Sequence, residues 1–564
     1  MPDQILPTKT AGIHPEQFSD DLFFAGNKKI AAIILAVSIL IGFGLRVNDL
    51  GTESLGEDEL NKLETVKEYR ENGLSGKNGE HPFLMKGLQT VSIIAVEKIN
   101  SLTNSPGLDI SEEAALRFPV ALFGSFTTLL IFLLMSELFG RSIALVSAML
   151  WAVEPMAIGF DRIAKEDSLV LFFFLLTMLF WIRGQTSAER GKPRWTWYAW
   201  AAAASFAGLM ASKYLPHLLA VVGAYYIIFQ YIPATKWRME RARWLKFFAV
   251  MGFTFLILNP TIMLPETWRE MLKFSSENRI GHDSYESMGA LYINKMTAWL
   301  AGVPWTFYYV FIAVKTSLPV LALFLIGLPM MFKRRLGDGR FFLFFWAFMW
   351  FMPFTFLGGK FTRYFTFVEP LLLIAAAATV CALAQFVAGR ISNMRTAPGL
   401  HAVILLIVIG SPLVNSLLEA PHYRLFTNNA GTLVAVKGSY FPHDEFYDAS
   451  TREIVASLAV DAASSATVAV ETLGLFEHYA KNANRDDLRL ISLSDKNEVR
   501  SLASGDYVVV AKGRRYVSNS DYLEYLSEMG SIPVRFTLGN TESATLYRLD
   551  ESQAEAIRKL ASRP

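Results

Sequence analysis

Three acidic residues, Glu57, Asp58 and Glu59, stand side by side shortly after the first apolar run of the sequence. A carboxylate held next to a hydroxyl group can act as a general base and withdraw the hydroxyl proton. The same stretch, GEDELNKLETVKEY, has apolar residues at helical spacing, and acids in a first turn favour the positive end of a helix dipole. The stretch is predicted to be a short helix at a membrane surface. Its first turn either only starts the helix or also holds a catalytic base.

A second group of charges lies in the stretch FDRIAKEDSLVLFFF, which forms a tight hairpin between two apolar runs. Charge so close to hydrocarbon is costly, and it is usually paired or functional. A structural salt bridge between Arg162 and Asp167 is the simpler interpretation. The functional one is a phosphate site, because further cations are expected on the same face: Lys213, Lys315, Lys360 and Arg363. Each alone could extend to lipid headgroups, whereas together they could hold a phosphate, with arginine suited to two-pronged contact.

Two histidine-containing stretches add candidate polar groups. EHPFLMKG contains His81 and Lys86, although a single histidine is more often a hydrogen-bonded surface residue. ENRIGHDSYESMG contains His282 and Asp283, which could bind a divalent metal, but no tight spacing of ligands demands one. No cofactor is therefore predicted with certainty. The sequence has no phosphate loop, dinucleotide fingerprint or nucleophile elbow.

The composition decides what kind of scaffold positions these groups. Apolar residues make up 52% of the chain, aromatic residues 13% and charged residues only 18%, which is typical of a polytopic membrane protein. A helix needs roughly 17 to 25 apolar residues to cross the hydrocarbon. Eleven such spans are predicted, at residues 30–48, 115–136, 142–160, 168–182, 196–212, 214–234, 245–263, 316–332, 341–357, 366–388 and 401–418. Segments 82–100 and 298–314 are apolar enough either to lie in the interface or to be further spans that this count omits.

The distribution of lysine and arginine predicts the orientation. In the eleven-span arrangement their clusters fall on one side, which the positive-inside rule makes cytoplasmic. The tail 1–27 is then cytoplasmic, the membrane domain covers 28–418, and its large outer loops are 51–113 and 264–315. After Leu418 short apolar runs alternate with polar residues and predict a soluble α/β domain over 419–564. This domain shares the outer compartment with the acidic stretch.

The only cysteine, Cys381, lies in an apolar run and cannot form an internal disulfide.

A series of motifs follows in order along residues 30 to 420: the acidic pair, HPFLMK, RFPVALFGSFTTLLIFLLMSELFG, DRIAKEDSLVLFF, SKYLP, GHDSY, VKTSLP and RYFTFVEPLLLIAAA. Each motif is weak alone, whereas their order and topological side are specific. Together they resemble the bacterial branch of the protein O-mannosyltransferase (PMT) family. That family lies in the GT-C superfamily of glycosyltransferases, which use polyprenyl-phosphate sugars.

The resemblance implies that a sugar, with mannose as the first choice, passes from a polyprenyl phosphate to an acceptor hydroxyl outside the membrane. The anomeric carbon is inverted. By this similarity Asp58 takes the place of the family's catalytic carboxylate, and Glu59 that of the acid beside it. The residues expected to contact the donor phosphate or sugar are Arg162, Asp167, Lys213, His282, Lys360 and Arg363.

The chain also departs from the family pattern. It reads HPFLMK where the family usually has HPPLGK or KPPL, so His81 and Lys86, like Lys315, are further candidates only. The extra acid Glu57 leaves open which carboxylate is the base, although neighbours on a helix point about 100° apart and only one is expected to face a given site.

The expected partners are the lipid-linked donor, a protein or lipid acceptor, and the bilayer. A net charge of +2 argues against nucleic acid. Protein Ser/Thr is the preferred acceptor, and lipid A or another envelope lipid or glycan is the alternative, since fold and site class do not fix the substrate. A secondary transporter is less favoured, because the charges collect at one face and no repeat is visible. The expected location is the bacterial plasma (inner) membrane.

Overall fold

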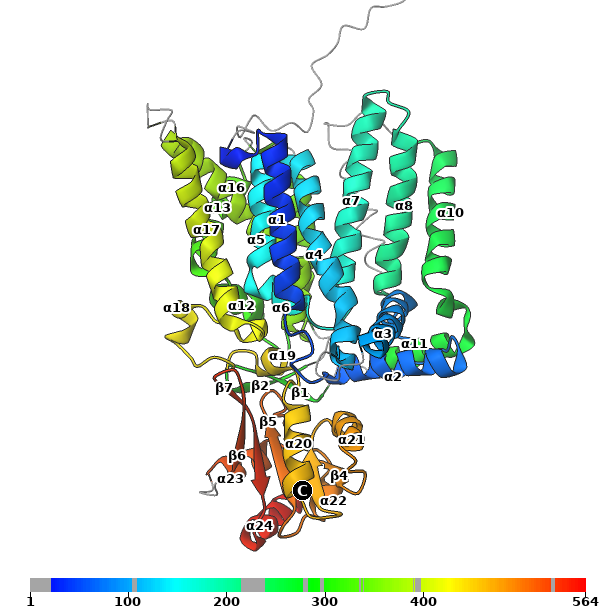
Figure 1. Cartoon of the computed structure of the whole chain (residues 1–564), viewed down its shortest axis with the longest axis vertical. Coiled ribbons are helices and arrows are strands. Elements are labelled where there is room, and N and C mark those ends of the chain that lie inside the picture. The colour runs from blue at the N-terminus through cyan, green and yellow to red at the C-terminus, as the bar shows by residue number, and fades with distance from the viewer. Residues whose placement is uncertain are drawn as a thin grey trace, which may run out of the picture.

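The structure is a computed structural model that describes residues 22–103, 109–214, 239–276, 282–294, 299–333, 336–337, 339–388, 390, 397–528 and 533–563. A bundle of long helices forms one end of the molecule, and a domain built around a sheet forms the other (Figure 1). The segments that join them carry the site described below.

Within the described residues, six helical segments are long and apolar enough to cross a membrane. They are α1 (Lys28–Val47), α4 (Glu112–Phe139), α7 (Asp167–Glu189), α16 (Glu369–Ala388), α17 (Ala397–Glu419) and the segment Gly339–Phe356. That last segment runs through α14 (Gly339–Trp346), a π-helical stretch and α15 (Met352–Phe356). The bundle is completed by α5 (Arg141–Val153), α6 (Pro155–Phe160), α8 (Trp195–Ser212), α10 (Arg241–Leu258), α12 (Phe307–Lys315) and α13 (Leu318–Met331).

Ten of the predicted spans correspond to helices. One of these ten is divided into two helices, and the eleventh span lies almost wholly outside the described residues. Span 142–160 is divided into α5 and α6 at Glu154, because Pro155 starts a new helix. Span 214–234 lies outside the described residues apart from its first position. The polytopic helical fold is confirmed, and the total of eleven spans stays a prediction.

Two helices of the first outer loop lie across the end of the bundle: α2 (Glu57–Asn72) and α3 (Phe83–Thr103) (Figure 1). The helix predicted for the acidic stretch is confirmed, and it buries Leu60, Leu63 and Val66 on one face. Its start is fixed because Glu59 accepts a hydrogen bond from the backbone N–H of Gly56 at 2.8 Å. A side chain at Gly56 would collide with the ring of Tyr447, so the glycine allows the later segment to pack against this helix start.

The sheet of the C-terminal domain has five strands in the order β4-β3-β5-β7-β6. β3 (Thr467–Val470) pairs in parallel with β4 (Arg489–Ser492) and β5 (Tyr507–Ala511), whereas β7 (Thr541–Arg548) pairs antiparallel with β5 and β6 (Val534–Leu538). Side chains of β3 alternate: Val468 and Val470 pack toward α20 (Thr451–Asp461) and α21 (Leu473–Asn482), and Ala469 packs on the opposite face. That opposite face is covered by α22 (Lys496–Val499), α23 (Ser520–Glu528) and α24 (Glu551–Ala561). The predicted α/β domain is confirmed.

The two parts are joined by buried contacts. Leu475 of α21 packs with Leu60 and Leu63 of α2, and the Tyr479 hydroxyl accepts a hydrogen bond from the Leu55 N–H at 2.8 Å. Shorter elements fill the junction: α11 (Pro265–Ser276), β1 (Ser284–Ser287), β2 (Ala290–Ile293), the 3-10 helix Thr362–Phe367, α18 (Asn429–Thr432) and α19 (Pro442–Phe446). The soluble domain is thereby held against the start of α2.

Candidate active site

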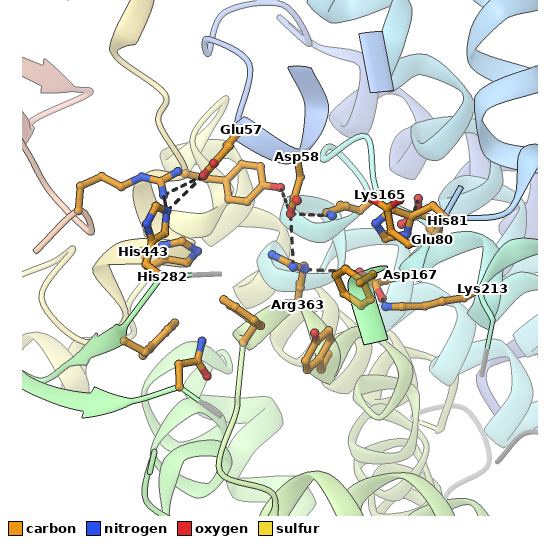
Figure 2. Close-up of a pocket in the computed structure, with 18 of the residues that line it drawn as sticks. Glu57, Asp58, Glu80, His81, Lys165, Asp167, Lys213, His282, Arg363 and His443 are labelled. Carbon is orange, nitrogen blue, oxygen red and sulfur yellow. Dashed lines mark hydrogen bonds and ion pairs between the residues drawn. The ribbon is translucent and has the colours of Figure 1, made fainter. Parts of the chain in front are cut away.

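A cavity of roughly 280 Å³ opens where the helix bundle meets the soluble domain. Its wall comes from parts of the chain that are far apart in the sequence: α2, the loop before α7, the end of α8, β1, the 3-10 helix after residue 361, and the soluble domain. Figure 2 shows Asp58 in the middle of this cavity, between Glu57 with two histidines on one side and a group of lysines on the other.

Asp58 is the carboxylate that cations surround most closely. Its Oδ2 lies 2.6 Å from Lys165 Nζ and 3.4 Å from Arg363 Nη2, and it accepts a hydrogen bond from the Tyr447 hydroxyl at 3.4 Å. Burial alone would raise the pKa of Asp58, but Lys165, Arg363 and Lys62 outweigh that effect and hold it well below its usual value. The carboxylate is therefore ionised at neutral pH, and its side chain keeps 38% of its surface open to the cavity.

Lys165 is a member of this site that the sequence interpretation did not select. It was visible only as one charge among several in the hairpin before α7, where nothing indicated which side chain faces inward. Its side chain is 7% exposed, and burial lowers the pKa of Lys165 to about 8. Asp58 opposes this shift, whereas the neighbouring Lys62 and Arg363 add to it.

A second ion-pair group lies beside the first. Lys213 Nζ is 2.8 Å from Asp167 Oδ1, and Arg363 Nε is 3.9 Å from Asp167 Oδ2. Arg363 also lies over the ring of Phe361, with its guanidinium carbon 4.5 Å from the ring centroid. The structure thus brings together four of the predicted site residues, Asp58, Asp167, Lys213 and Arg363.

A smaller hollow continues the cavity toward the bundle. It shares Asp167, Lys213, Arg363 and Tyr364 with the main cavity, and its other wall is apolar and mostly aromatic: Val170, Trp350, Phe354 and Phe367. The cationic group therefore lies at the head of a hydrophobic groove between α7 and the segment Gly339–Phe356.

His81, one of the further candidates, also lines the cavity. Its Nδ1 is 3.5 Å from Glu166 Oε1, the same oxygen that pairs with Lys62 Nζ at 2.8 Å. Burial holds the pKa of His81 well below its usual value despite Glu166, so the imidazole is neutral at pH 7. It can accept or donate one hydrogen bond inside the cavity.

Glu59 does not face the cavity. It is fully buried and forms an ion pair with Arg117 at 2.7 Å, and its Oε1 accepts a hydrogen bond from the Ala164 N–H at 2.7 Å. The 100° step between neighbours on a helix separates Asp58 from Glu59, which joins α2 to α4 and to the hairpin. It does not remove Glu57, because Glu57 and Asp58 both line the cavity, so the expectation that only one acid faces it is wrong. Glu59 therefore orients the start of α2.

Four cationic residues that the sequence suggested for the site do not line the cavity. Arg162 donates to the carbonyls of Arg46, Asn48 and Asp49 and forms no salt bridge with Asp167 in the described part of the chain, so that simpler interpretation is wrong. The other three are buried and end on carbonyl or carboxylate oxygens outside the cavity: Lys86 on Asn78 and His81 carbonyls, Lys315 on Glu445, and Lys360 on Val303 and Leu357 carbonyls. Long flexible cations can satisfy nearby carbonyls, and sequence position does not reveal this choice.

His282 lies in the cavity but away from the cationic group. Its Nε2 contacts Glu57 Oε2 at 3.3 Å and Arg514 Nη1 at 2.8 Å, and its ring stacks on Tyr516 with centroids 4.2 Å apart. Asp283 accepts hydrogen bonds from the N–H groups of Val517 and Ser518 and does not join His282 as a ligand. Among the described residues no group of three or more His, Cys, Asp or Glu side chains could hold a metal ion. Within these residues, the side chains around His282 therefore do not fit the divalent-metal site that the sequence suggested as possible.

Comparisons with known proteins find a family resemblance over one segment and similarity in the overall fold. Residues 107–263 match the family model of dolichyl-phosphate-mannose-protein mannosyltransferases. No curated protein matches the chain. The apo oligosaccharyltransferase of Archaeoglobus fulgidus is similar in structure, with a TM-score of 0.52 and 12% identity over 86% of this chain and 70% of that one. ArnT from Cupriavidus metallidurans bound to undecaprenyl phosphate aligns over 92% of this chain and 98% of that one, with 14% identity and a TM-score of 0.47.

The fold is of the GT-C type, as in the Archaeoglobus fulgidus oligosaccharyltransferase, and the apolar helices make the chain an integral membrane protein. The match of residues 107–263 to the dolichyl-phosphate-mannose-protein mannosyltransferase model agrees with the resemblance seen in the motifs. The roles of the individual site residues stay predictions.

Proposed function

We propose that this protein is an inverting glycosyltransferase that moves mannose from a polyprenyl-phosphate donor to a protein Ser/Thr hydroxyl on the outer face of the bacterial plasma membrane. The single observation that carries the proposal is the position of Asp58. Its open carboxylate lies within 3.4 Å of Lys165 and Arg363, and Arg363 also lines the head of the apolar groove. The N-terminus is then cytoplasmic, and the domain 419–564 is extracytoplasmic.

The chemistry follows from this arrangement. The ionised Asp58 withdraws the proton of the acceptor hydroxyl as the hydroxyl oxygen attacks the anomeric carbon. The bond between that carbon and the phosphate oxygen breaks on the opposite side, so the configuration inverts and polyprenyl phosphate leaves. Negative charge grows on the leaving phosphate, and Lys165, Lys213 and Arg363 are placed to stabilise it before the reaction starts.

The groove supports a lipid-linked donor over a water-soluble one. Its polar end holds Lys213 and Arg363, and its other end is lined by Trp350, Phe354 and Phe367. A phosphate attached to an isoprenoid chain needs this combination of a cationic head site and an apolar path into the bilayer. The family description names dolichyl-phosphate-mannose, which supports mannose as the first sugar to test.

The proposal is tested by transfer of radiolabelled mannose from polyprenyl-phosphate-mannose by the purified protein in detergent. A Ser/Thr peptide and an envelope lipid extract serve as acceptors, and products are separated into peptide and lipid fractions. We expect label in the peptide, with an anomeric configuration opposite to that of the donor. Label only in the lipid fraction would reassign the acceptor. No transfer from any polyprenyl-phosphate sugar would overturn the proposed function.

The low pKa of Lys165 gives a pH dependence for this reaction. Because burial places that pKa at about 8, the cation is present below pH 8 and is lost as the pH rises through it. We expect kcat/KM for the donor to fall above about pH 8. In Lys165→Arg the guanidinium stays charged, so the fall should disappear. Lys67→Arg, which changes a surface lysine paired with Glu112, is the matched control and should keep the wild-type profile. The same alkaline fall in Lys165→Arg would contradict the role given to Lys165.

A further inference from the structure

The cavity has a second half that the transfer step described above does not use. We call it the Arg514 half, and it consists of Glu57, His282, His443, Arg514 and Tyr516. Figure 2 shows the labelled members Glu57, His282 and His443 together on one side of Asp58, with Lys165, Asp167 and Lys213 on the other. A donor phosphate bound at the lysines therefore leaves this half free on the opposite side of Asp58.

The soluble domain builds most of this half. Arg514 and Tyr516 lie in the segment between β5 and α23, and His443 lies in α19. The segment is fixed to the membrane domain because Asp283 accepts hydrogen bonds from the N–H groups of Val517 at 3.2 Å and Ser518 at 3.1 Å. The soluble domain is thus part of the cavity wall.

The charges of the Arg514 half do not cancel. Arg514 is 6% exposed and its Nε donates to Asp448 Oδ1 at 2.7 Å, while its Nη1 donates to Glu57 Oε2 at 3.3 Å. One cation is therefore shared by two carboxylates. Glu57 keeps 50% of its side chain exposed, so the uncompensated negative charge faces the cavity.

Two histidines line this half beside Arg514. A guanidinium has only donors, so at the 2.8 Å contact with Arg514 Nη1 the His282 Nε2 lone pair accepts. Burial lowers the pKa of His443 to about 3, and Arg514 adds to the shift, so His443 is neutral. On the donor side, by contrast, Asp58 and Asp167 pair with Lys165, Lys213 and Arg363. Glu166, which also lines the cavity there, pairs with Lys62 at 2.8 Å.

We propose that the Arg514 half seats the acceptor and selects a hydroxyl-bearing polypeptide segment that has no negative charge near the hydroxyl. The inference rests on the proposed function, since it needs a donor at the lysines. A hydroxyl that enters from this side meets Asp58 directly, opposite the leaving phosphate. The exposed Glu57 carboxylate repels acceptor phosphates or carboxylates and attracts lysine or arginine next to the target residue. A phosphate-bearing lipid acceptor is disfavoured by the same field.

The test measures transfer by the full-length protein in detergent to three peptides that share one Ser/Thr core. The core is flanked by lysines in the first peptide, by neutral residues in the second and by aspartates in the third. We expect wild-type kcat/KM to fall in that order, with roughly tenfold between the first and the last. Glu57→Gln removes the uncompensated charge and should reduce the spread to below about threefold while KM for the donor is unchanged. Glu71→Gln, an exposed acid on the same helix, is the matched control and should keep the full spread.

A second variant tests the contribution of the soluble domain without removing a charge. Arg514→Lys loses the two-pronged contact with Asp448 and should raise KM for the peptide several-fold with little change in KM for the donor. Arg535→Lys changes an exposed arginine of the same domain and is the control.

The outcomes separate this inference from the proposed function. Equal kcat/KM for all three peptides, or a preference that survives Glu57→Gln, overturns the acceptor site while leaving the transferase proposal in place. Transfer only to lipid or to a free glycan also overturns it. Failure of the wild-type protein to bind polyprenyl-phosphate-mannose, measured by titration without any acceptor, would overturn the proposed function itself.

Discussion

Replacing Asp58 by Asn is expected to lower kcat for sugar transfer by about three orders of magnitude, within the range of general-base contributions. The amide keeps the size of the side chain but cannot take up the acceptor proton. The donor should still bind, since Lys165, Lys213 and Arg363 remain and lose a competing carboxylate. Single-turnover transfer and a separate titration of donor binding measure the two effects independently.

Two controls make this result specific. Glu71→Gln removes an exposed carboxylate from the same helix and should leave kcat within about twofold of wild type, as expected for a surface change. Glu59→Gln breaks the buried pair with Arg117 and should lower thermal stability, because it leaves a buried cation without its partner. If Asp58→Asn kept more than about a tenth of wild-type kcat, Asp58 would not be the general base.

The sequence predicted the parts of the fold that depend on local patterns. Apolar runs located the bundle helices, and the alternation of short apolar runs with polar residues after Leu418 predicted the α/β domain that contains β3, β4 and β5. The start of α2 was predictable because acids and apolar spacing act within one helix. By contrast, the division of α5 from α6 depended on Pro155 inside an apolar run, which hydropathy does not detect.

The candidate site was predictable only in part. Asp58 and Arg363 lie at the cavity because they follow or precede spans that end at the same face. The end points of the long cations Arg162 and Lys360 were not predictable, since each ends on carbonyls that only the folded chain brings near. Arg514 reaches a carboxylate 457 positions earlier in the sequence, and no local pattern marks such a contact.

Arg363→Gln is expected to lower kcat by roughly two to three orders of magnitude and to raise KM for the donor. This guanidinium lies 3.4 Å from Asp58 and 3.9 Å from Asp167, so it can contact both the base and the phosphate site. Its side chain is 11% exposed and stacks on Phe361, which holds it in place before the donor arrives. A cation fixed where charge develops stabilises the transition state more than a mobile one.

Arg363→Lys separates charge from geometry. The ammonium keeps the positive charge but loses the planar fork and the stacking on Phe361, so we expect only a partial recovery of kcat. Arg70→Gln is the control. It breaks an exposed ion pair between Arg70 and Glu97, both in the first outer loop, and should leave kcat unchanged. A normal kcat in Arg363→Gln, with only KM for the donor raised, would mean that Arg363 binds the ground-state phosphate and gives no added stabilisation as the phosphate leaves.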